Sequence, residues 1–345
     1  MISQEEWGEI PCGHEVILFT LKNEAGMIAK ITNYGATVTE LWVPDKNGVL
    51  ADVVLGYDSL EGYKNHTFYL GAICGRYANR IANGEFTLDG YTYRLARNNG
   101  PNALHGGIQG LDKRVWDAEI ITDEEEGDEA LQFTIKSPEG HEGYPGNVNI
   151  KVTYRLSADN ALDIRYEATT DKATVINLTN HSYFNLTGCK TDVLSHVLTI
   201  NADTYTIPDA TSIPTGETPE LTPELDFRSP KTIGRDIKGM PYGYDHNYII
   251  KGYDGSSLRQ AAVLIEPESG RKMETLTTEP GMQLYSSFYL DGSISKKGIA
   301  YNQFYGVCFE AQHYPDSPNK PHFPSTVLQP NDVYTQQTVY RFSIA

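Results

Sequence analysis

The segment from residue 180 to residue 186 places an ionisable side chain among hydrogen-bonding neighbours. It reads Asn-His-Ser-Tyr-Phe-Asn-Leu and follows an apolar stretch, residues 174–178, that is typical of a strand. An imidazole has an ordinary pKa near neutrality and neighbouring amides can fix its tautomer, so His181 is suited to transferring protons. The same pattern also fits a histidine that only closes a loop at a strand end, and both interpretations stay open at this point.

A glutamate near the C-terminus is a candidate partner for this histidine. The alternation of a strand at residues 305–312 puts Cys308, Glu310 and Gln312 on one face and apolar side chains on the other. A carboxylate between cysteine and glutamine within a strand is poorly placed for hydration. Because buried carboxylates are rare unless they are paired, the pattern favours a polar cleft with a functional Glu310 over an unusual core.

Three loops carry further side chains that suit binding to vicinal hydroxyl groups. Residues 75–84 contain two arginines and two asparagines, whose N–H groups and carbonyls can contact such hydroxyls. His105 precedes two glycines, so a small ligand could approach its ring closely. Asp245 precedes an expected strand and could accept hydrogen bonds from two hydroxyl groups. Each of these residues could instead have an ordinary structural role in its loop.

Motifs for nucleotides, metals and serine nucleophiles are absent from the chain. No GxGxxG, GxxxxGK[ST] or GxSxG segment occurs, and neither His14-Glu15 nor His141-Glu142 continues into the zinc-protease spacing. The nine histidines do not cluster like metal ligands. The sequence therefore predicts chemistry that uses neither a metal nor a nucleotide cofactor.

Many short strands must position these residues. Asp89-Gly90 predicts a two-residue hairpin between residues 85–88 and 91–95, and residues 148–156 and 162–168 alternate on either side of a turn. No helical pattern exceeds about two turns, so crossover helices for a parallel sheet are missing. The chain therefore predicts an all-β, largely antiparallel β-sandwich in one domain of residues 1–345. We expect a brief helix near residues 59–64 and further strands at residues 37–43, 52–56, 197–200, 248–250, 261–266, 282–289, 305–312 and 333–342.

The charge balance disfavours polyanionic partners. The 345 residues include 45 acidic and 28 basic ones, for a formal net charge of −17. Such a chain repels phosphate backbones and anionic membrane surfaces, so we expect neither nucleic acid nor a membrane as partner. No signal peptide pattern, no bilayer-length apolar run and no CxxC pair occurs, and we expect a cytoplasmic protein.

Taken together, the polar segments resemble the aldose 1-epimerase (galactose mutarotase) family. One departure is Ser286-Ser287-Phe288, where family members often carry Thr-Gly-Asn, and it bears on the rim of the cleft and the substrate range. The resemblance covers nearly the whole chain in the expected order, through GRYANRI (75–81), NNGPNALHGG (98–107), GLDKRVW (110–116), NHSYFNL (180–186), DHN (245–247), PGMQLY (280–285), CFEAQHYPDSPN (308–319) and LQPNDVY (328–334).

This resemblance implies a large antiparallel supersandwich of the galactose mutarotase type, with an open sugar cleft and no cofactor or metal. It implies His181 as general acid and Glu310 as general base for interconverting the α and β anomers of free aldohexoses such as galactose and glucose. His105 could instead help to polarise the ring oxygen. The expected partner is a free sugar, and the expected assembly is a monomer or homodimer. The implied sugar contacts are Asn79, Arg80, His105, Tyr183, Asp245 and Gln283, with Arg76 as a weaker candidate.

Three other functions rank lower. A hexose-6-phosphate 1-epimerase would need an extra Arg or Lys cluster for the phosphate, and the motifs supply only Arg76 and Arg80. A non-catalytic sandwich module that binds carbohydrate would need neither an acid nor a base, whereas His181 and Glu310 are both present. A glycosidase would need a second carboxylic acid where this chain has an imidazole.

Overall fold

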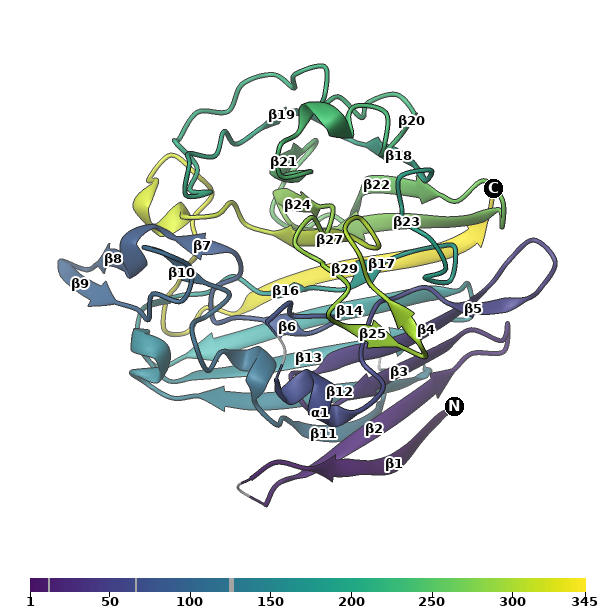
Figure 1. The fold of residues 1–345 in the computed structure, drawn as a ribbon. Coiled ribbons are helices and arrows are strands. Elements are labelled where there is room, and N and C mark those ends of the chain that lie inside the picture. The colour runs from purple at the N-terminus through teal and green to yellow at the C-terminus, as the bar shows by residue number, and fades with distance from the viewer. Residues whose placement is uncertain (12, 66, 124–126) are drawn as a thin grey trace.

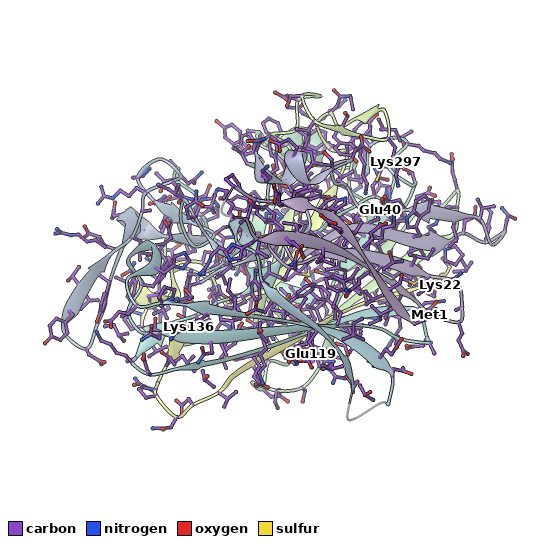
Figure 2. The ribbon with its side chains drawn as sticks, turned by 90° about the horizontal axis from the view of Figure 1, so that it is seen from below. Met1, Lys22, Glu40, Glu119, Lys136 and Lys297 are labelled. Carbon is purple, nitrogen blue, oxygen red and sulfur yellow. The ribbon has the colours of Figure 1, made fainter. Side chains whose placement is uncertain are left out.

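The N-terminal part of the chain folds into a meander of five antiparallel strands. The computed structural model describes residues 1–11, 13–65, 67–123 and 127–345 (Figure 1). Each strand of the meander pairs with the next along the chain, and Met1 lies beside Lys22, the last residue of the second strand (Figure 2). The strands are β1 (Ile2–Glu9), β2 (Glu15–Lys22), β3 (Ile28–Thr32), β4 (Thr37–Pro44) and β5 (Leu50–Asp52).

A nine-stranded antiparallel sheet forms the largest layer. Its C-terminal strand β29, yellow in Figure 1, lies between β14 and β23 and so joins strands from the two halves of the chain. The order across the sheet is β11 (Asp117–Thr122), β12 (Glu129–Ser137), β13 (Val148–Leu156), β14 (Ala161–Thr170), β29 (Tyr334–Ile344), β23 (Arg271–Thr277), β22 (Arg259–Ile265), β18 (Val197–Ile200) and β20 (Lys231–Thr232).

A second five-stranded antiparallel sheet carries Glu310 and three of the expected sugar contacts. Its register places Glu310 opposite Gln283, Tyr183 opposite Cys308, and Asp245 opposite Tyr285. Directly opposed residues point to the same face of a sheet, so these side chains share one surface. The order is β17 (Tyr183–Phe184), β27 (Val307–Gln312), β24 (Gly281–Tyr285), β21 (Asp245–Ile250) and β19 (Ala202–Tyr205).

The remaining elements are short. No helix in the described part of the chain has the length and apolar character that crossing a bilayer requires. The helices are α1 (Leu60–Lys64) and the 3-10 turns η1 (Ala82–Gly84), η2 (Leu111–Lys113), η3 (His141–Gly143), η4 (Ile237–Gly239) and η5 (Ser317–Asn319). The small strand pairs are β6 (Ile73–Cys74) with β16 (Thr179–Asn180), β7 (Arg80–Ile81) with β10 (Ala103–Leu104), β8 (Glu85–Leu88) with β9 (Tyr91–Arg94), β15 (Thr174–Val175) with β28 (Val327–Leu328), and β25 (Ser295–Lys296) with β26 (Ile299–Ala300).

One large apolar cluster connects the three main sheets. Ile31 of β3, Ile150 of β13 and Phe309 of β27 all belong to it, and each is buried. Removing apolar surface from water is the main stabilising contribution to such a fold, at about 25 cal/mol per Å². Because side chains alternate along a strand, the burial of Phe309 in this core leaves Glu310 for the opposite, polar face of β27.

Most of the predicted elements are confirmed. The fold is all-β and antiparallel, β8 and β9 pair around Asp89-Gly90, β13 pairs with β14, and α1 begins at Leu60. Two predicted strands are shorter in the structure, since β24 ends at Tyr285 and β27 begins at Val307. The strand expected at residues 52–56 is wrong. There β5 ends at Asp52, Val54 forms only an isolated bridge with Phe184, and the N–H groups of Val53 and Leu55 donate to the carbonyls of Leu41 and Tyr183.

Candidate active site

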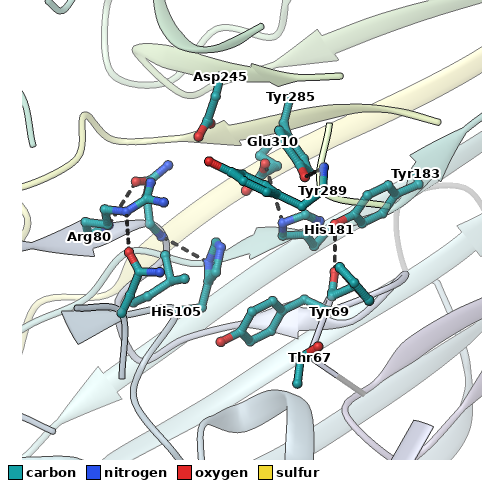
Figure 3. A pocket seen from close by; sticks show the side chains of 14 residues that line it. Thr67, Tyr69, Arg80, His105, His181, Tyr183, Asp245, Tyr285, Tyr289 and Glu310 are labelled. Carbon is teal, nitrogen blue, oxygen red and sulfur yellow. Dashed lines mark hydrogen bonds and ion pairs between the residues drawn. The ribbon is translucent and has the colours of Figure 1, made fainter. Parts of the chain in front are cut away.

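A pocket opens where the polar face of the β27 sheet meets the loops around β7 and β10. It has a volume of about 250 Å³, and the side chains labelled in Figure 3 converge on it. The sequence separations of these residues are large, so the sheet register and the loop anchors bring them together. The lining residues are Thr67, Phe68, Tyr69, Asn79, Arg80, Asn99, Leu104, His105, His181, Tyr183, Asp245, Tyr285, Tyr289 and Glu310.

His181 and Glu310 face each other in this pocket. The distance from His181 Nε2 to Glu310 Oε1 is 3.6 Å, and both side chains are buried. The backbone of His181, between β16 and β17, is fixed by hydrogen bonds with Gly71 and Ala72. Its ring stacks on Tyr183 with centroids 5.1 Å apart. The pair therefore sits on rigid backbone at a distance over which both groups can reach one small ligand.

The environment of Glu310 favours its protonated form. Burial raises the pKa of Glu310 well above its usual value, the carboxylate of Asp245 adds to the increase, and Arg80 opposes it. Glu310 Oε2 has no hydrogen-bond partner among residues 1–11, 13–65, 67–123 and 127–345. A carboxylate whose pKa is raised in this way is a stronger base once it has lost its proton.

His105 is held in one tautomer by the backbone of the neighbouring loop. The backbone N–H of Asn79 donates to His105 Nδ1 at 3.1 Å. The backbone N–H of His105 donates in return to the carbonyl of Asn79 at 3.0 Å. Because Nδ1 accepts a hydrogen bond, the proton of the neutral ring lies on Nε2. Burial, together with His181 and Arg80, lowers the pKa of His105 well below its usual value. His105 is therefore suited to donating a neutral hydrogen bond.

The same tautomer bears on metal binding. The expectation that the histidines do not cluster is wrong for one pair, since ligand atoms of His105, His181 and Glu310 lie within 4.8 Å of one another. A ligating imidazole nitrogen must carry no proton. The Asn79 amide leaves the proton on the outward nitrogen of His105, so this arrangement suits hydrogen bonding to a polar ligand better than coordination of a metal.

Asp245 and Arg80 complete the polar lining. Gln283 Nε2 donates to Asp245 Oδ1 at 2.6 Å, and Arg80 Nε donates to Asn99 Oδ1 at 3.0 Å. Gln283 is therefore placed behind Asp245 and holds it, whereas Asp245, Arg80 and Asn79 themselves line the pocket.

Tyr183 contributes its ring to the wall of the pocket. Its hydroxyl donates to the carbonyl of Phe68 at 2.9 Å, and the side chain is buried. The ring faces the cavity beside His181. The phenol of Tyr183 is thus engaged within the protein, and its apolar face is what the pocket presents.

Arg76 does not reach the pocket, which corrects its assignment as a possible sugar contact. Its buried guanidinium donates to Ser137 Oγ at 2.7 Å and to the carbonyls of Pro145 and Gly146 at 2.6 and 3.2 Å. Burial lowers the pKa of Arg76 to about 10. Successive side chains of the loop point in different directions, and Arg80 alone of the two arginines faces the cavity.

Several lining residues were not identified from the sequence. Asn99 and Tyr285 lie inside the recognised motifs, so their motif membership could have marked them. Tyr69 lies outside any motif or predicted element, and Tyr289 only ends the strand predicted at residues 282–289, so neither residue carries a signal that it lines a pocket. Tyr69 packs on His105 with ring centroids 4.6 Å apart, whereas Tyr289 is 58% exposed at the rim.

Comparison with known proteins is consistent with this geometry. A family model described as aldose 1-epimerase matches residues 18–341. Galactose mutarotase from Homo sapiens is 40% identical over 349 residues, covering 100% of this chain and 99% of the human protein. Aldose 1-epimerase from Escherichia coli (strain K12) is 38% identical over 340 residues, covering 96% of each chain.

Solved structures show the same fold. An aldose epimerase homologue from C. elegans has a TM-score of 0.86 and 33% identity, covering 94% of this chain and 98% of its own. Galactose 1-epimerase from Lactobacillus acidophilus NCFM has a TM-score of 0.86 and 28% identity, covering 100% of this chain and 99% of its own. From the family match and the full-length relatives, the chain belongs to the aldose 1-epimerase family.

Proposed function

We propose that this protein is an aldose 1-epimerase that interconverts the α and β anomers of free aldohexoses such as galactose and glucose. The observation that carries the proposal is the buried pair of His181 Nε2 and Glu310 Oε1, 3.6 Å apart in a pocket lined by hydrogen-bonding side chains. The full-length similarity to galactose mutarotases and aldose 1-epimerases supports the same activity.

An acid and a base are sufficient for this reaction. Glu310 removes the proton from the C1 hydroxyl while His181 protonates the ring oxygen, and the C1–ring oxygen bond breaks to give the open-chain aldehyde. Rotation about C1–C2 then presents the other face of the aldehyde, and reclosure with the proton transfers reversed gives the other anomer. The two oxygens are bonded to the same carbon, so groups as close as His181 and Glu310 can reach both.

The starting state requires an ionised Glu310 and a protonated His181. The raised pKa of Glu310 makes it a strong base for the hydroxyl proton, and the interaction of the two groups couples their titrations. We expect a bell-shaped dependence of kcat/KM on pH, whose limbs belong to the pair.

The remaining pocket residues would bind and orient the sugar. The Nε2–H of His105 would donate to a sugar oxygen, Asp245 would accept from hydroxyl groups, and Arg80 would donate to them. Asn79 offers further polar contacts, and Gln283 would hold Asp245 in place. The ring of Tyr183 would support the apolar side of the sugar.

The pocket favours a free sugar over a sugar phosphate. Arg80 is its one Lys or Arg side chain among the described lining residues, and a phosphate group is usually held by more than one cation or by a bidentate arginine. A binding module without turnover would not need the acid–base pair. A cytoplasmic location, a role in galactose metabolism, and the monomeric or homodimeric state stay predictions.

The test is to follow the optical rotation of freshly dissolved α-D-glucose or α-D-galactose against the uncatalysed rate. We expect acceleration by the wild-type protein, and a fall of about 10²–10⁴-fold in kcat for Glu310→Gln and for His181→Asn, as for loss of a general acid or base. Circular dichroism checks that both variants are folded. No acceleration of either sugar by the wild type, or near-normal activity of Glu310→Gln, would contradict the proposal.

A further inference from the structure

Both nitrogens of the His181 ring are approached by residues of one strand. Cys308 Sγ lies 3.7 Å from Nδ1, and Glu310 Oε1 lies 3.6 Å from Nε2. Residues two apart in a strand lie on the same face, about 6.6–6.8 Å apart, which leaves room for an imidazole to contact both side chains. The register of β27 thus aligns a thiol and a carboxylate with the two ends of the same ring.

The ring has little freedom to turn away from these two contacts. The His181 N–H donates to the carbonyl of Ala72, and the Gly71 N–H donates to the carbonyl of His181, both at 2.9 Å. Tyr183 and Tyr69 stack on it, at ring centroid distances of 5.1 and 5.9 Å. The contact between Cys308 and Nδ1 is therefore a fixed feature of the site.

We infer that Cys308 is a positioning residue whose sulfur sets the tautomer of His181 by accepting a weak hydrogen bond from Nδ1–H. With the proton of the neutral ring on Nδ1, the nitrogen that faces Glu310 and the sugar, Nε2, can release and take up the proton of the reaction. The same contact holds the Nδ1–H when His181 is protonated on both nitrogens. The effect on rate rests on the proposed function, whereas the tautomer does not.

The thiol suits this task because it is a weak acceptor without a charge. Cys308 is fully buried, and burial raises the pKa of its thiol well above the usual value, so the sulfur stays an uncharged thiol at neutral pH. A carboxylate at this position would bind the Nδ1 proton strongly and hold the ring as a cation. A reversible epimerase needs His181 to give up its proton in ring opening and to recover it in reclosure.

The kinetic test compares two substitutions of Cys308 with a control. Cys308→Ala should lower kcat by about 10- to 100-fold, the range found when a partner that orients a functional histidine is removed, with KM changed by less than about twofold. Cys308→Ser keeps a donor and an acceptor of similar size and should retain most of kcat. The matched control is Cys189→Ala. Cys189 is buried in the same apolar cluster as Cys308, but its thiol contacts the carbonyl of Asp52 and not His181.

A second measurement does not depend on activity, and its first part needs only the wild-type protein. In the ¹⁵N-labelled wild-type protein, the neutral form of His181 should show the Nδ1–H tautomer by NMR, and a folded Cys308→Ala should shift it toward a mixture. The Nε2–H tautomer in the wild type, or full kcat in a folded Cys308→Ala, would overturn the inference. An Nδ1–H tautomer without any epimerisation would support the tautomer assignment and count against the proposed function.

Discussion

At the scale of single residues, the chemistry of the pocket depends on two carboxylates that lie near each other. Asp245 raises the pKa of Glu310 beyond the effect of burial, and Arg80 counteracts part of this. Removing the charge of Asp245 therefore makes Glu310 easier to ionise and, once ionised, a weaker base. Asp245, the proposed acceptor for sugar hydroxyls, therefore also sets the base strength of Glu310.

Asp245→Asn should move the acidic limb of the kcat/KM profile to lower pH. The sign follows because the variant lacks the negative charge that disfavours ionisation of Glu310. KM should rise as well, since an amide accepts fewer hydrogen bonds than a carboxylate. The measurement is kcat/KM against pH by polarimetry, with the surface variant Asp203→Asn as control. An acidic limb that stays in place or moves upward contradicts the coupling.

The sequence identified which segments hold polar residues but not where each side chain points. Every predicted contact except Gln283 and Arg76 lines the pocket, and Gln283 touches Asp245 from behind. Arg76 and Arg80 lie in one loop and differ in outcome, because the direction of a loop side chain depends on backbone angles that tertiary contacts impose. The tautomer of His105 depends on a backbone N–H that no motif contains.

At the scale of elements, a hydrogen-bond network that begins at the buried Arg76 supports the loop that carries His105. Arg76 fastens residues 137–146 by donating to Ser137 and to the carbonyls of Pro145 and Gly146. Ser137 Oγ in turn lies 2.9 Å from His141 Nδ1. The next residue, Glu142, accepts hydrogen bonds from the N–H groups of residues 108 and 109, at 2.8 and 3.0 Å. Arg76 therefore supports the segment from which Glu142 holds residues 108 and 109, close to His105 in the chain.

Glu142→Gln should loosen this loop without touching the sugar. One of the two carboxylate oxygens that accept from backbone N–H groups becomes an amide NH₂, so the loop carrying His105 loses a hydrogen bond to a charged group. We expect kcat/KM to fall on the order of tenfold, less than the about 10²-fold that a 1 Å misplacement of a catalytic group can cost. Glu139→Gln, which affects an ion pair with Lys172 in the same segment, is the control. Equal kinetics for the two variants would contradict the network.

Strand prediction succeeded where periodicity was long and failed where pairing was brief. β13 and β14 alternate over nine and ten residues, so their pattern was visible in the sequence. β16 and β17, which flank His181, have two residues each. A two-residue strand forms because a segment far away in the sequence offers hydrogen-bond partners, and the local sequence pattern does not indicate which segment that is. The backbone that positions His181 could therefore not be derived from the sequence.

At the scale of the whole molecule, a buried ion pair joins the ends of the two strands that carry the site. His313 follows β27, Glu279 precedes β24, and His313 Nδ1 lies 2.6 Å from Glu279 Oε2. Burial lowers the pKa of His313, but the charge and the hydrogen bond of Glu279 together raise it by more, and the ring of Tyr253 lies edge-on to the imidazole with centroids 6.3 Å apart. The pair thus ties global stability to the protonation of one imidazole.

The sign of this linkage predicts a loss of stability at higher pH. A histidine whose folded-state pKa is raised contributes fully below its unfolded pKa of about 6.5, and the contribution is lost as pH rises through the raised value. The melting temperature of the wild type should therefore fall over this window more than that of His313→Asn. That variant should itself lose about 3–5 kcal/mol at lower pH, because Glu279 is left buried and unpaired. Parallel pH dependences in the two proteins would contradict the role of His313.

Side chains of the C-terminal strand β29 hydrogen-bond to the backbone of β27, the strand that carries Glu310. Tyr340 of β29 donates to the carbonyl of Phe309 at 3.0 Å, and Gln336 donates to the carbonyl of Ala311 at 3.1 Å. Phe309 and Ala311 are the two sequence neighbours of Glu310. A strand from the far end of the chain, inserted between β14 and β23, therefore links the nine-stranded sheet to the backbone on either side of the base.

The double variant Tyr340→Phe/Gln336→Leu should weaken this link. Each buried hydrogen bond contributes about 0.5–1.5 kcal/mol, so urea unfolding should show a loss of about 1–3 kcal/mol. Measured well below the melting temperature, kcat should fall by severalfold while KM changes little, because β27 carries the proposed base Glu310 and none of the proposed sugar contacts. Tyr91→Phe, on the exposed β9, is the control and should leave both quantities unchanged. If the double variant loses stability but keeps its full kcat, then β29 supports the fold alone, and the position of Glu310 is set within its own sheet.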